Sequence, residues 1–463
     1  LTLTELSAGL AAKRFSSREI ADALLGRIAK ANDKLHAFIE VYAAEAQALA
    51  DAADQARASG FPLGPLHGLP IAYKDLCDIA GKVGTGGSKM FEARVATETS
   101  NTVERLTAAG MVPLGKLHMV EFAFGGWGTN PLMGAPWNPW DLETHRIAGG
   151  SSSGTGVAVA ARLTPAGIGS DTGGSVRIPS AFNGLVGLKA TFGRIGLSGT
   201  ILLSWTLDSI GPLARCVEDC ALLLNALAAP DPRDPTTLGQ PLEDFTLATR
   251  PGSIEGLRIA MPDTRQLPNF MHADVVKSWQ AAGRTFESLG ATVEAVRLPD
   301  WFFDLSRPAG TIIASEAYSL HRDYIEDARK AIGPGVRARA LQAKTLLPGA
   351  YAEELRNMAE RRQAFAEWFR PHDAILMPTM ALPAIPLSEV DETSPIPGYL
   401  TRPANYLGLC SLAMPSGQSA GLPLGIQIVG KPFAERDVLR LGKAFQDATD
   451  HHRQAPDLST LGL

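Results

Sequence analysis

The sequence contains few cysteines. Only four occur among 463 residues, and no two of them have the C-x-x-C spacing of redox or zinc motifs. Secreted domains that depend on disulfides are rich in cysteine, so this scarcity indicates a reducing compartment. The nine histidines include no H-E-x-x-H and none pairs with a cysteine at zinc-like spacing, so we expect no metal. The four cysteines are Cys77, Cys216, Cys220 and Cys410.

An excess of basic residues is also absent. The chain has 43 Lys and Arg against 48 Asp and Glu, a formal net charge of -5, and no run rich in Lys or Arg. Proteins that bind a phosphate backbone directly present such a run, so we expect no nucleic acid among the partners. A homodimer is suggested only by the general frequency of such dimers.

Long apolar runs are missing as well. No stretch approaches the roughly 20 apolar residues that cross a bilayer. The N-terminus lacks the basic and then apolar profile of a signal peptide. We therefore expect no membrane association and a cytoplasmic protein. Because the first residue is Leu1 and not Met, removal of a leader stays open.

Helical and strand-like segments alternate along the chain, which predicts an α/β architecture. Residues 1–60 read as a helical preface, with Ser16 as N-cap of a helix over 20–31. A Gly- and Pro-rich break at 61–65 then opens a core over 61–225, and residues 300–370 form a mainly helical region that we expect to shape the substrate pocket. With no internal repeat or low-complexity linker, one large domain is the better interpretation.

The most unusual segment runs from Gly149 to Ser175, where two serine and glycine clusters flank a short helix pattern. One such cluster marks a loop more often than a catalytic site. A serine hydroxyl becomes an effective nucleophile only beside a base and backbone donors. The G-x-S-x-G motif here would make Ser152 the nucleophile of an α/β-hydrolase. Polar residues over 141–146 stand where that fold needs a buried strand, which argues against it.

Lys74 offers a base for a serine. It lies at the end of an apolar strand predicted over 69–75. Burial there would lower its pKa from about 10.4 towards a value at which it accepts a proton. A lone lysine at a strand end is usually a solvated surface group, so this residue alone leaves both interpretations open. The S-x-x-K motif of penicillin-binding enzymes is absent, since no serine has a lysine three residues later.

Four segments resemble the amidase signature family in order and spacing and together span nearly the whole chain. They are GLPIAYKD at 68–75, GGSSSGTG at 149–156, SDTGGSVRIPS at 170–180 and GLPLGIQIVG at 421–430. The resemblance implies one large α/β domain whose central mixed β-sheet is covered by helices on both faces. It also implies a triad of Lys74 as general base, Ser151 as bridging serine and Ser175 as nucleophile, the two serines 24 positions apart. Family members hold the bridging serine in a cis peptide bond.

The same resemblance implies an oxyanion hole made of consecutive backbone N–H groups. A helix predicted over 176–182 would direct the positive end of its dipole at the oxyanion. Asp171 and Arg177 flank the nucleophile, and we expect this opposite-charge pair to brace the loop. The N–H groups belong to Thr172, Gly173, Gly174 and Ser175.

The implied reaction is hydrolysis of a linear, non-peptide carboxylic amide through an acyl-enzyme. Ser175 attacks the carbonyl, the relay of Ser151 and Lys74 protonates the leaving nitrogen, and water deacylates the serine without any cofactor. Aromatic residues in segments that vary within the family suggest a small apolar or aryl amide as substrate, although each is as consistent with a core position. The candidate pocket residues are Phe124, Gly126, Trp127 and Trp205.

A second function fits the same triad. The glutamine amidase subunit of a tRNA-dependent amidotransferase works in a complex and supplies ammonia to a partner. The stretch 338–373 does not resemble that subunit, which favours a free-standing amidase. An inactive binding protein is disfavoured because all three triad positions are present. His118 stands where many family members have asparagine, either in the pocket wall or as a loop histidine with satisfied hydrogen bonds.

Overall fold

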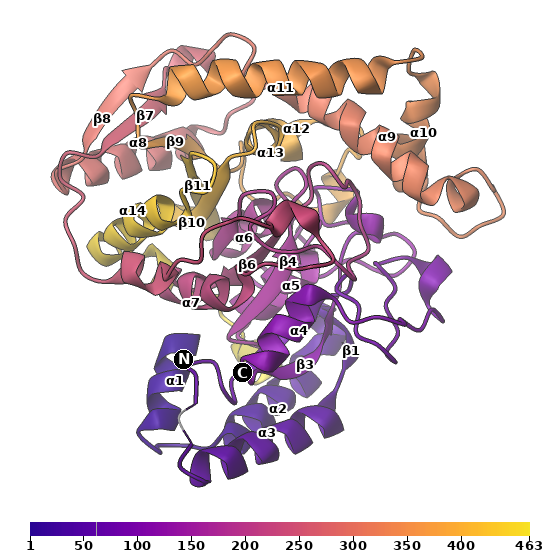
Figure 1. The fold of residues 1–463 in the computed structure, drawn as a ribbon, viewed down its shortest axis with the longest axis vertical. Coiled ribbons are helices and arrows are strands. Elements are labelled where there is room, and N and C mark those ends of the chain that lie inside the picture. The colour runs from indigo at the N-terminus through magenta and orange to yellow at the C-terminus, as the bar shows by residue number, and fades with distance from the viewer. Residues whose placement is uncertain (62) are drawn as a thin grey trace.

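One mixed β-sheet organises the chain. The computed structural model describes residues 1–61 and 63–463, so Pro62, in the predicted break, lies outside the described residues. Eleven strands follow the order β1-β3-β2-β4-β6-β5-β10-β11-β9-β7-β8 within the described part (Figure 1). The strands are β1 (Phe38–Val41), β2 (Pro70–Lys74), β3 (Val112–Leu117), β4 (Ala166–Ser170), β5 (Val186–Lys189), β6 (Ile210–Ala214), β7 (Arg258–Pro262), β8 (Thr292–Val296), β9 (Ala374–Pro378), β10 (Cys410–Ser419) and β11 (Leu422–Gly430).

The strand directions join the two halves of the chain. β2 pairs in parallel with both β3 and β4, and the strands from β4 across to β9 pair antiparallel. β7 pairs in parallel with β9 and β8. Because the C-terminal hairpin of β10 and β11 lies between strands of the first and second halves, the sheet is continuous and the prediction of a single domain is confirmed.

Helices pack on both faces of this sheet, as predicted. On one face, Ala181 of α6 is so close to β11 that a Cβ on Gly425 would lie 2.8 Å from the Ala181 Cβ. On the opposite face, Gly442 of α14 packs on Leu412 and Met414 of β10. Among the described residues there are α1 (Leu3–Ala11), α2 (Ser17–Leu35), α3 (Ala43–Ala58), α4 (Asn101–Ala108), α5 (Ser153–Ala160), α6 (Arg177–Asn183), α7 (Val217–Leu227), α8 (Ala273–Ser288), α9 (Ser306–Ile325), α10 (Pro334–Leu341), α11 (Ala350–Phe369), α12 (Ile396–Tyr399), α13 (Arg402–Tyr406) and α14 (Glu435–Ala448).

The first 60 residues are mainly helical but contribute one strand. Ser16 is the N-cap of α2, since its hydroxyl accepts the Glu19 N–H at 3.0 Å and its own N–H donates to the Glu19 carboxylate at 2.8 Å. This capping box matches the predicted helix start, although α2 extends further in both directions. β1 was not predicted; it pairs antiparallel with β3 at the edge of the sheet.

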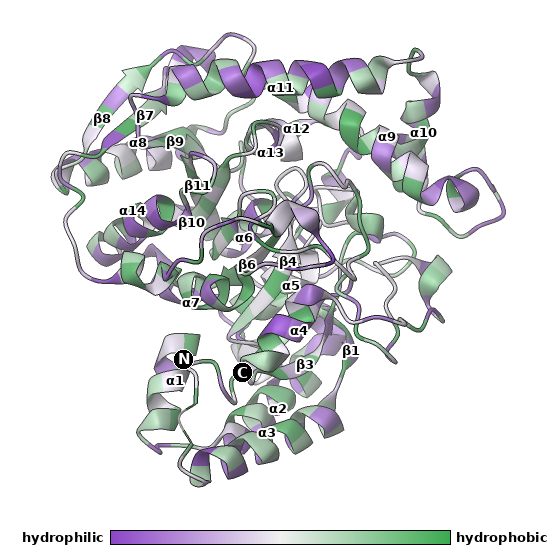
Figure 2. Cartoon of the chain, in the orientation of Figure 1, coloured by the Kyte–Doolittle hydropathy of each residue, from purple (hydrophilic) through white to green (hydrophobic). Residues whose placement is uncertain are grey.

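Helices α9 to α11 lie to one side of the sheet, along the upper border of Figure 1. They occupy the region predicted to be helical over 300–370. α11 alternates hydrophilic and hydrophobic residues (Figure 2), and it buries Met358, Phe365 and Phe369. Within residues 1–61 and 63–463, none of the helices has both the length and the apolar character that a bilayer crossing requires.

Candidate active site

Two neighbouring parallel strands place the first polar groups of the site side by side. β2 ends at Lys74 and β4 ends at Ser170, and Tyr73 pairs with Ile168 in the parallel ladder between them. Both strands are buried along their full length. Lys74 Nζ donates a hydrogen bond to Ser170 Oγ at 2.8 Å. The lysine is therefore an interior residue and not the solvated surface group that a strand end usually carries.

The first serine cluster reaches the same lysine. Lys74 Nζ lies 2.6 Å from Ser151 Oγ, although 77 positions separate the two residues. The Gly150–Ser151 peptide bond is cis, as the family resemblance implied. Backbone hydrogen bonds fix this turn: the Gly150 N–H donates to Gly126 O at 2.8 Å, and the Val120 N–H donates to Ser151 O at 3.1 Å.

Burial changes the protonation of Lys74. Removal of the ammonium group from water lowers its pKa to about 7, and the nearby Asp208 carboxylate opposes but does not cancel this effect. A lysine with an ordinary pKa is almost fully protonated at neutral pH. Lys74 instead has a substantial unprotonated fraction, which is the form that accepts a proton.

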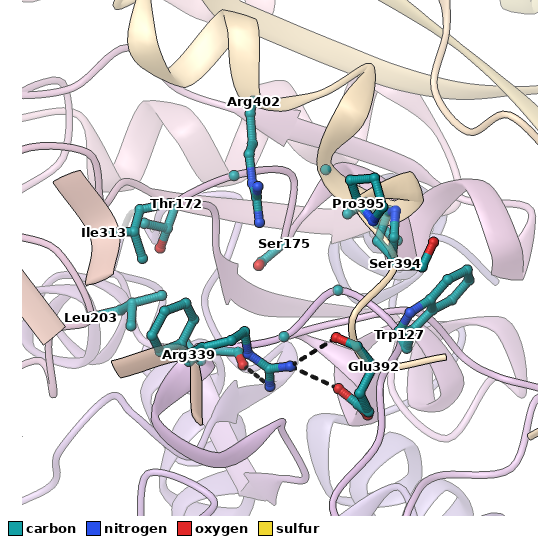
Figure 3. A pocket seen from close by; sticks show the side chains of 18 residues that line it. Trp127, Thr172, Ser175, Leu203, Ile313, Arg339, Glu392, Ser394, Pro395 and Arg402 are labelled. Carbon is teal, nitrogen blue, oxygen red and sulfur yellow. Dashed lines mark hydrogen bonds and ion pairs between the residues drawn. The ribbon is translucent and has the colours of Figure 1, made fainter. Parts of the chain in front are cut away.

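Ser175 lies in the turn between β4 and α6 and lines a cavity of about 70 Å³ (Figure 3). Ser175 is nearly buried, with 6% of its surface exposed. The Ser152 N–H donates to Ser175 O at 3.3 Å, so the two serine clusters are in contact. The Ser152 hydroxyl itself is fully buried and contacts the Ser170 backbone at 3.3 Å. Ser175, and not Ser152, is the serine that faces the cavity.

An ion pair braces the loop that carries Ser175. Asp171 Oδ1 accepts the Gly174 N–H at 2.8 Å, and Asp171 Oδ2 accepts the Val176 N–H at 3.1 Å. Arg177 Nη2 lies 3.0 Å from the same carboxylate. Burial by itself would raise the pKa of Asp171, but the Arg177 guanidinium holds the pKa well below its usual range. Asp171 is thus ionised and bonded to the loop backbone.

One of the four backbone N–H groups proposed for the oxyanion hole is already used in these hydrogen bonds. The Gly174 N–H is already donated to Asp171, which leaves those of Thr172, Gly173 and Ser175 as candidate donors to an oxyanion. Gly174 has a φ of +126°, in the region that favours glycine. Thr401 closes over this turn, and its hydroxyl donates to Gly173 O at 2.6 Å.

Three of the four predicted pocket residues line the cavity. Phe124, Gly126 and Trp127 do so, whereas Trp205 lies outside the residues that line it and is 40% exposed. The Trp127 indole N–H donates to Asp391 O at 3.0 Å, which fixes that ring against the loop before α12.

The cavity also contains charged residues that the sequence did not indicate. Arg339 Nη1 lies 2.8 Å from Glu392 Oε2, and Arg402 extends into the cavity from the opposite side (Figure 3). These side chains come from α10, from the loop before α12 and from α13. No local motif marks them, since each is more than 160 positions from Ser175. Ser170 had a signal that was overlooked: it is the polar residue that ends the apolar strand before the second serine cluster.

His118 lies away from the cavity. Its side chain is buried, its Nε2 lies 3.1 Å from Met133 O, and burial lowers its pKa to about 4. Its carbonyl accepts the Gly154 N–H at 2.9 Å, at the start of α5. Of the two roles considered for His118, the position supports a loop histidine, but its hydrogen bonds are not all satisfied, since Nδ1 has no hydrogen-bond partner among the described residues. In the part of the chain that the structure describes, no three His, Cys, Asp or Glu side chains are grouped to hold a metal ion.

Comparison with known proteins gives consistent relationships over the whole chain. The model of the family described as Amidase matches residues 19–439. A glutamyl-tRNA(Gln) amidotransferase subunit of Azotobacter vinelandii is 39% identical, with 99% of each chain covered. A solved structure described as a vestigial protein complex that reveals the origins of an s-triazine catabolic enzyme has a TM-score of 0.91 at 33% identity, covering 96% of this chain and 98% of that one. The corresponding glutamyl-tRNA(Gln) amidotransferase subunit of Thermotoga maritima has a TM-score of 0.80 at 29% identity, covering 96% and 94%.

These relatives correct one prediction. We expected a small-molecule amide as substrate from the family resemblance, no nucleic acid from net charge, no membrane from the lack of long apolar runs, and a homodimer from general frequency. That prediction about partners is wrong, because the relatives are named as one subunit of an enzyme of glutamyl-tRNA(Gln). The physical reason is that net charge reports only on direct contact with a phosphate backbone. It carries no information about a nucleic acid that another subunit holds.

Proposed function

This chain belongs to the amidase family of amide-hydrolysing enzymes, and we propose that it hydrolyses the side-chain amide of glutamine as one subunit of a larger amidotransferase. The observation that carries the chemistry is the buried Lys74, whose Nζ lies 2.6 Å from Ser151 Oγ. Ser175 lines the cavity, and the N–H of Ser152, the residue after Ser151, donates to Ser175 O. The relatives named as amidotransferase subunits, which match almost end to end, support the assembly and the substrate.

In the proposed reaction the unprotonated Lys74 amine takes a proton from Ser151, and Ser151 takes one from Ser175. The Ser175 oxygen then attacks the amide carbon, and the N–H groups of Thr172, Gly173 and Ser175 stabilise the oxyanion. Collapse of this intermediate breaks the C–N bond, and the relay returns the proton to the nitrogen, which leaves as ammonia. Water attacks the acyl-enzyme through the same relay and releases the carboxylic acid.

Charged residues in the cavity bear on the choice of substrate. Phe124 and Trp127 are consistent with the small apolar or aryl amide that the sequence suggested. Arg339, Glu392 and Arg402 share the same cavity, and burying charged side chains against an apolar substrate is unfavourable. A polar substrate such as glutamine therefore accounts better for the lining. Arg339 lies within the helical region over 300–370, which supports a role for that region in shaping the pocket.

A second candidate is the hydrolysis of a small amide in the breakdown of a nitrogen-rich compound. It is favoured by the TM-score of 0.91 to the structure related to an s-triazine catabolic enzyme, compared with 0.80 for the Thermotoga maritima protein. Either function is compatible with a cytoplasmic location, which the four buried free thiols support.

Labelling and turnover test the proposal separately. A serine-directed fluorophosphonate, followed by peptide mass spectrometry, should modify Ser175, and Ser175→Ala should abolish the label. Modification of Ser152 instead would contradict the proposed relay. Glutaminase activity should then be measured with the chain alone and with the other subunits of a bacterial amidotransferase and tRNA. Stimulation by the subunits supports the first candidate, whereas turnover of other small amides but not of glutamine supports the second.

A further inference from the structure

Arg402 is a cation in the cavity without an acidic partner. Its Nη1 donates to Ser306 O at 3.2 Å and to Ser306 Oγ at 3.3 Å. Among residues 1–61 and 63–463, no carboxylate forms a salt bridge with this guanidinium, and the charged neighbour that affects its pKa is another cation, Arg339. Burial and Arg339 together lower the pKa of Arg402 to about 10, so it remains charged at neutral pH.

The contrast with Arg339 is informative. Arg339 forms an ion pair with Glu392 at 2.8 Å and also donates to Phe124 O. The charge of one arginine in the cavity is therefore neutralised within the protein, and the charge of the other is not. A partly buried cation such as Arg402 is stabilised by a counter-charge, and a substrate carboxylate in this cavity would supply one.

Arg402 lies close to the loop that carries Ser175. Its side chain packs across Gly173, since a Cβ on that glycine would lie 3.1 Å from Arg402 Cγ and 3.4 Å from Nε. Its guanidinium end is directed toward Ser175 (Figure 3). A ligand bound to this guanidinium would thus be held beside both the nucleophile and a candidate oxyanion donor.

We propose that Arg402 binds a carboxylate of the substrate, so that the substrate is the monoamide of a short dicarboxylic acid or a close derivative of one. A guanidinium binds a carboxylate through two parallel N–H donors, a geometry that a single amide or hydroxyl does not match. Because the Arg402 side chain packs on Gly173, two positions before Ser175, we expect only a short chain between the carboxylate and the amide. This inference rests on the proposed amide hydrolysis and specifies its substrate class.

Binding to an inactive variant tests this directly. In the Ser175→Ala background, calorimetry should compare succinamate and glutaramate with the neutral diamides succinamide and glutaramide. Each pair differs only in whether the second end is a carboxylate or an amide. We expect the acids to bind at least tenfold more tightly. Equal affinity within each pair, or no binding of either acid, would overturn the proposal.

Substitutions then assign the preference to Arg402. Arg402→Gln should remove the difference between acids and diamides, and Arg402→Lys should retain part of it. Arg307→Gln is the matched control, because Arg307 is an exposed arginine on the neighbouring helix α9 and should leave the preference unchanged. An unchanged preference in Arg402→Gln would refute the role of Arg402. Thermal denaturation shows whether each variant is folded. If Arg402→Gln does not fold, the binding preference of Arg402→Lys tests the role of Arg402.

The outcomes separate this proposal from the proposed function. If Ser175 is not labelled and no amide is hydrolysed, but the acids still bind more tightly through Arg402, the amide hydrolysis fails and the carboxylate site stands. If amides are hydrolysed with the same KM for acids and diamides, the amide hydrolysis stands and the carboxylate site fails. A comparison of the binding of glutamine with that of glutaramate, which lacks the ammonium group, further distinguishes the two candidate functions.

Discussion

Arg177 and Asp171 form an ion pair with 3.0 Å between Nη2 and Oδ1, and neither side chain is exposed. The pair spans the turn that carries Ser175, and the same carboxylate accepts the Gly174 N–H. Its ionised state depends on Arg177, without which burial would favour the neutral acid. The loop that carries the proposed nucleophile is therefore held in place by an ion pair in the interior.

Substitution of this carboxylate should damage both stability and catalysis. Asp171→Asn leaves the Arg177 charge without its counter-ion, which typically lowers the free energy of unfolding by about 3–5 kcal/mol. We also expect kcat to fall, because asparagine keeps only one of the two acceptor oxygens that hold the Gly174 and Val176 N–H groups. Urea denaturation and amide turnover measure the two effects. Asp263→Asn is the control: it breaks a pair with Arg265, whose side chain is 88% exposed, and should leave the denaturation midpoint nearly unchanged. Equal behaviour of the two variants would contradict the bracing role.

The pH dependence of the rate should report Lys74. Below its pKa of about 7 the lysine is an ammonium ion and accepts no proton; above that pKa the amine is free. We therefore expect kcat/KM to rise with pH as a single titration with its midpoint near pH 7. A rate that is flat or falls between pH 6 and 8 (about one unit on either side of this pKa) would count against Lys74 as the base.

The two adjacent serines should differ sharply when substituted. Ser151→Ala removes the hydroxyl that contacts Lys74 Nζ, and we expect kcat to fall by about 10²–10⁴, the usual contribution of general acid–base catalysis. Ser152→Ala is the matched control, since its buried hydroxyl contacts only the Ser170 backbone among the described residues. It should have a much smaller effect. Similar losses in the two variants would mean that Ser151 acts through the fold alone.

Gly174 should tolerate no side chain. Its φ is +126°, and a Cβ would lie 2.3 Å from Thr401 Oγ1. Gly174→Ala should therefore displace Thr401 or the turn, and lower both the melting temperature and kcat. Gly26→Ala provides the opposite case. Gly26 is an exposed position inside α2 with open space around it, and the substitution should stabilise the protein by about 1 kcal/mol. Calorimetric melting of both variants tests this contrast.

Most strands and helices could be predicted from apolar runs and helix caps, but β1, β6 and β10 could not. β6 contains Gly211 and Pro212, and β10 contains Pro415 and Gly417. These residues locally indicate turns, and proline lacks the N–H of a regular ladder. Here tertiary pairing prevails: Pro212 lies opposite Ile168, and a bulge accommodates the residues between Pro415 and Gly417.

The sequence pointed more clearly to the proposed reacting groups than to the cavity residues around them. Lys74, Ser151 and Ser175 occur in conspicuous motifs, and the structure brings the first two into hydrogen-bonding contact. Arg339 and Arg402 look like ordinary surface residues in the sequence, because a charged side chain reveals its burial only when distant segments pack together. The hydrogen bond from the Gly174 N–H to Asp171 was equally unpredictable, since it depends on the path of the turn.

The proposed relay and the charged residues of the cavity come from separate stretches of chain, and this has a consequence for how specificity can change. The proposed relay lies within residues 74–175, whereas Arg339, Glu392 and Arg402 lie within 339–402. Replacement of the second stretch with that of another member of the family would alter which amide is accepted and would leave Lys74, Ser151 and Ser175 themselves in place, provided that Thr401 and its hydrogen bond to Gly173 O are retained. New substrates can then arise through exchange of one contiguous segment, without any intermediate that has lost its nucleophile.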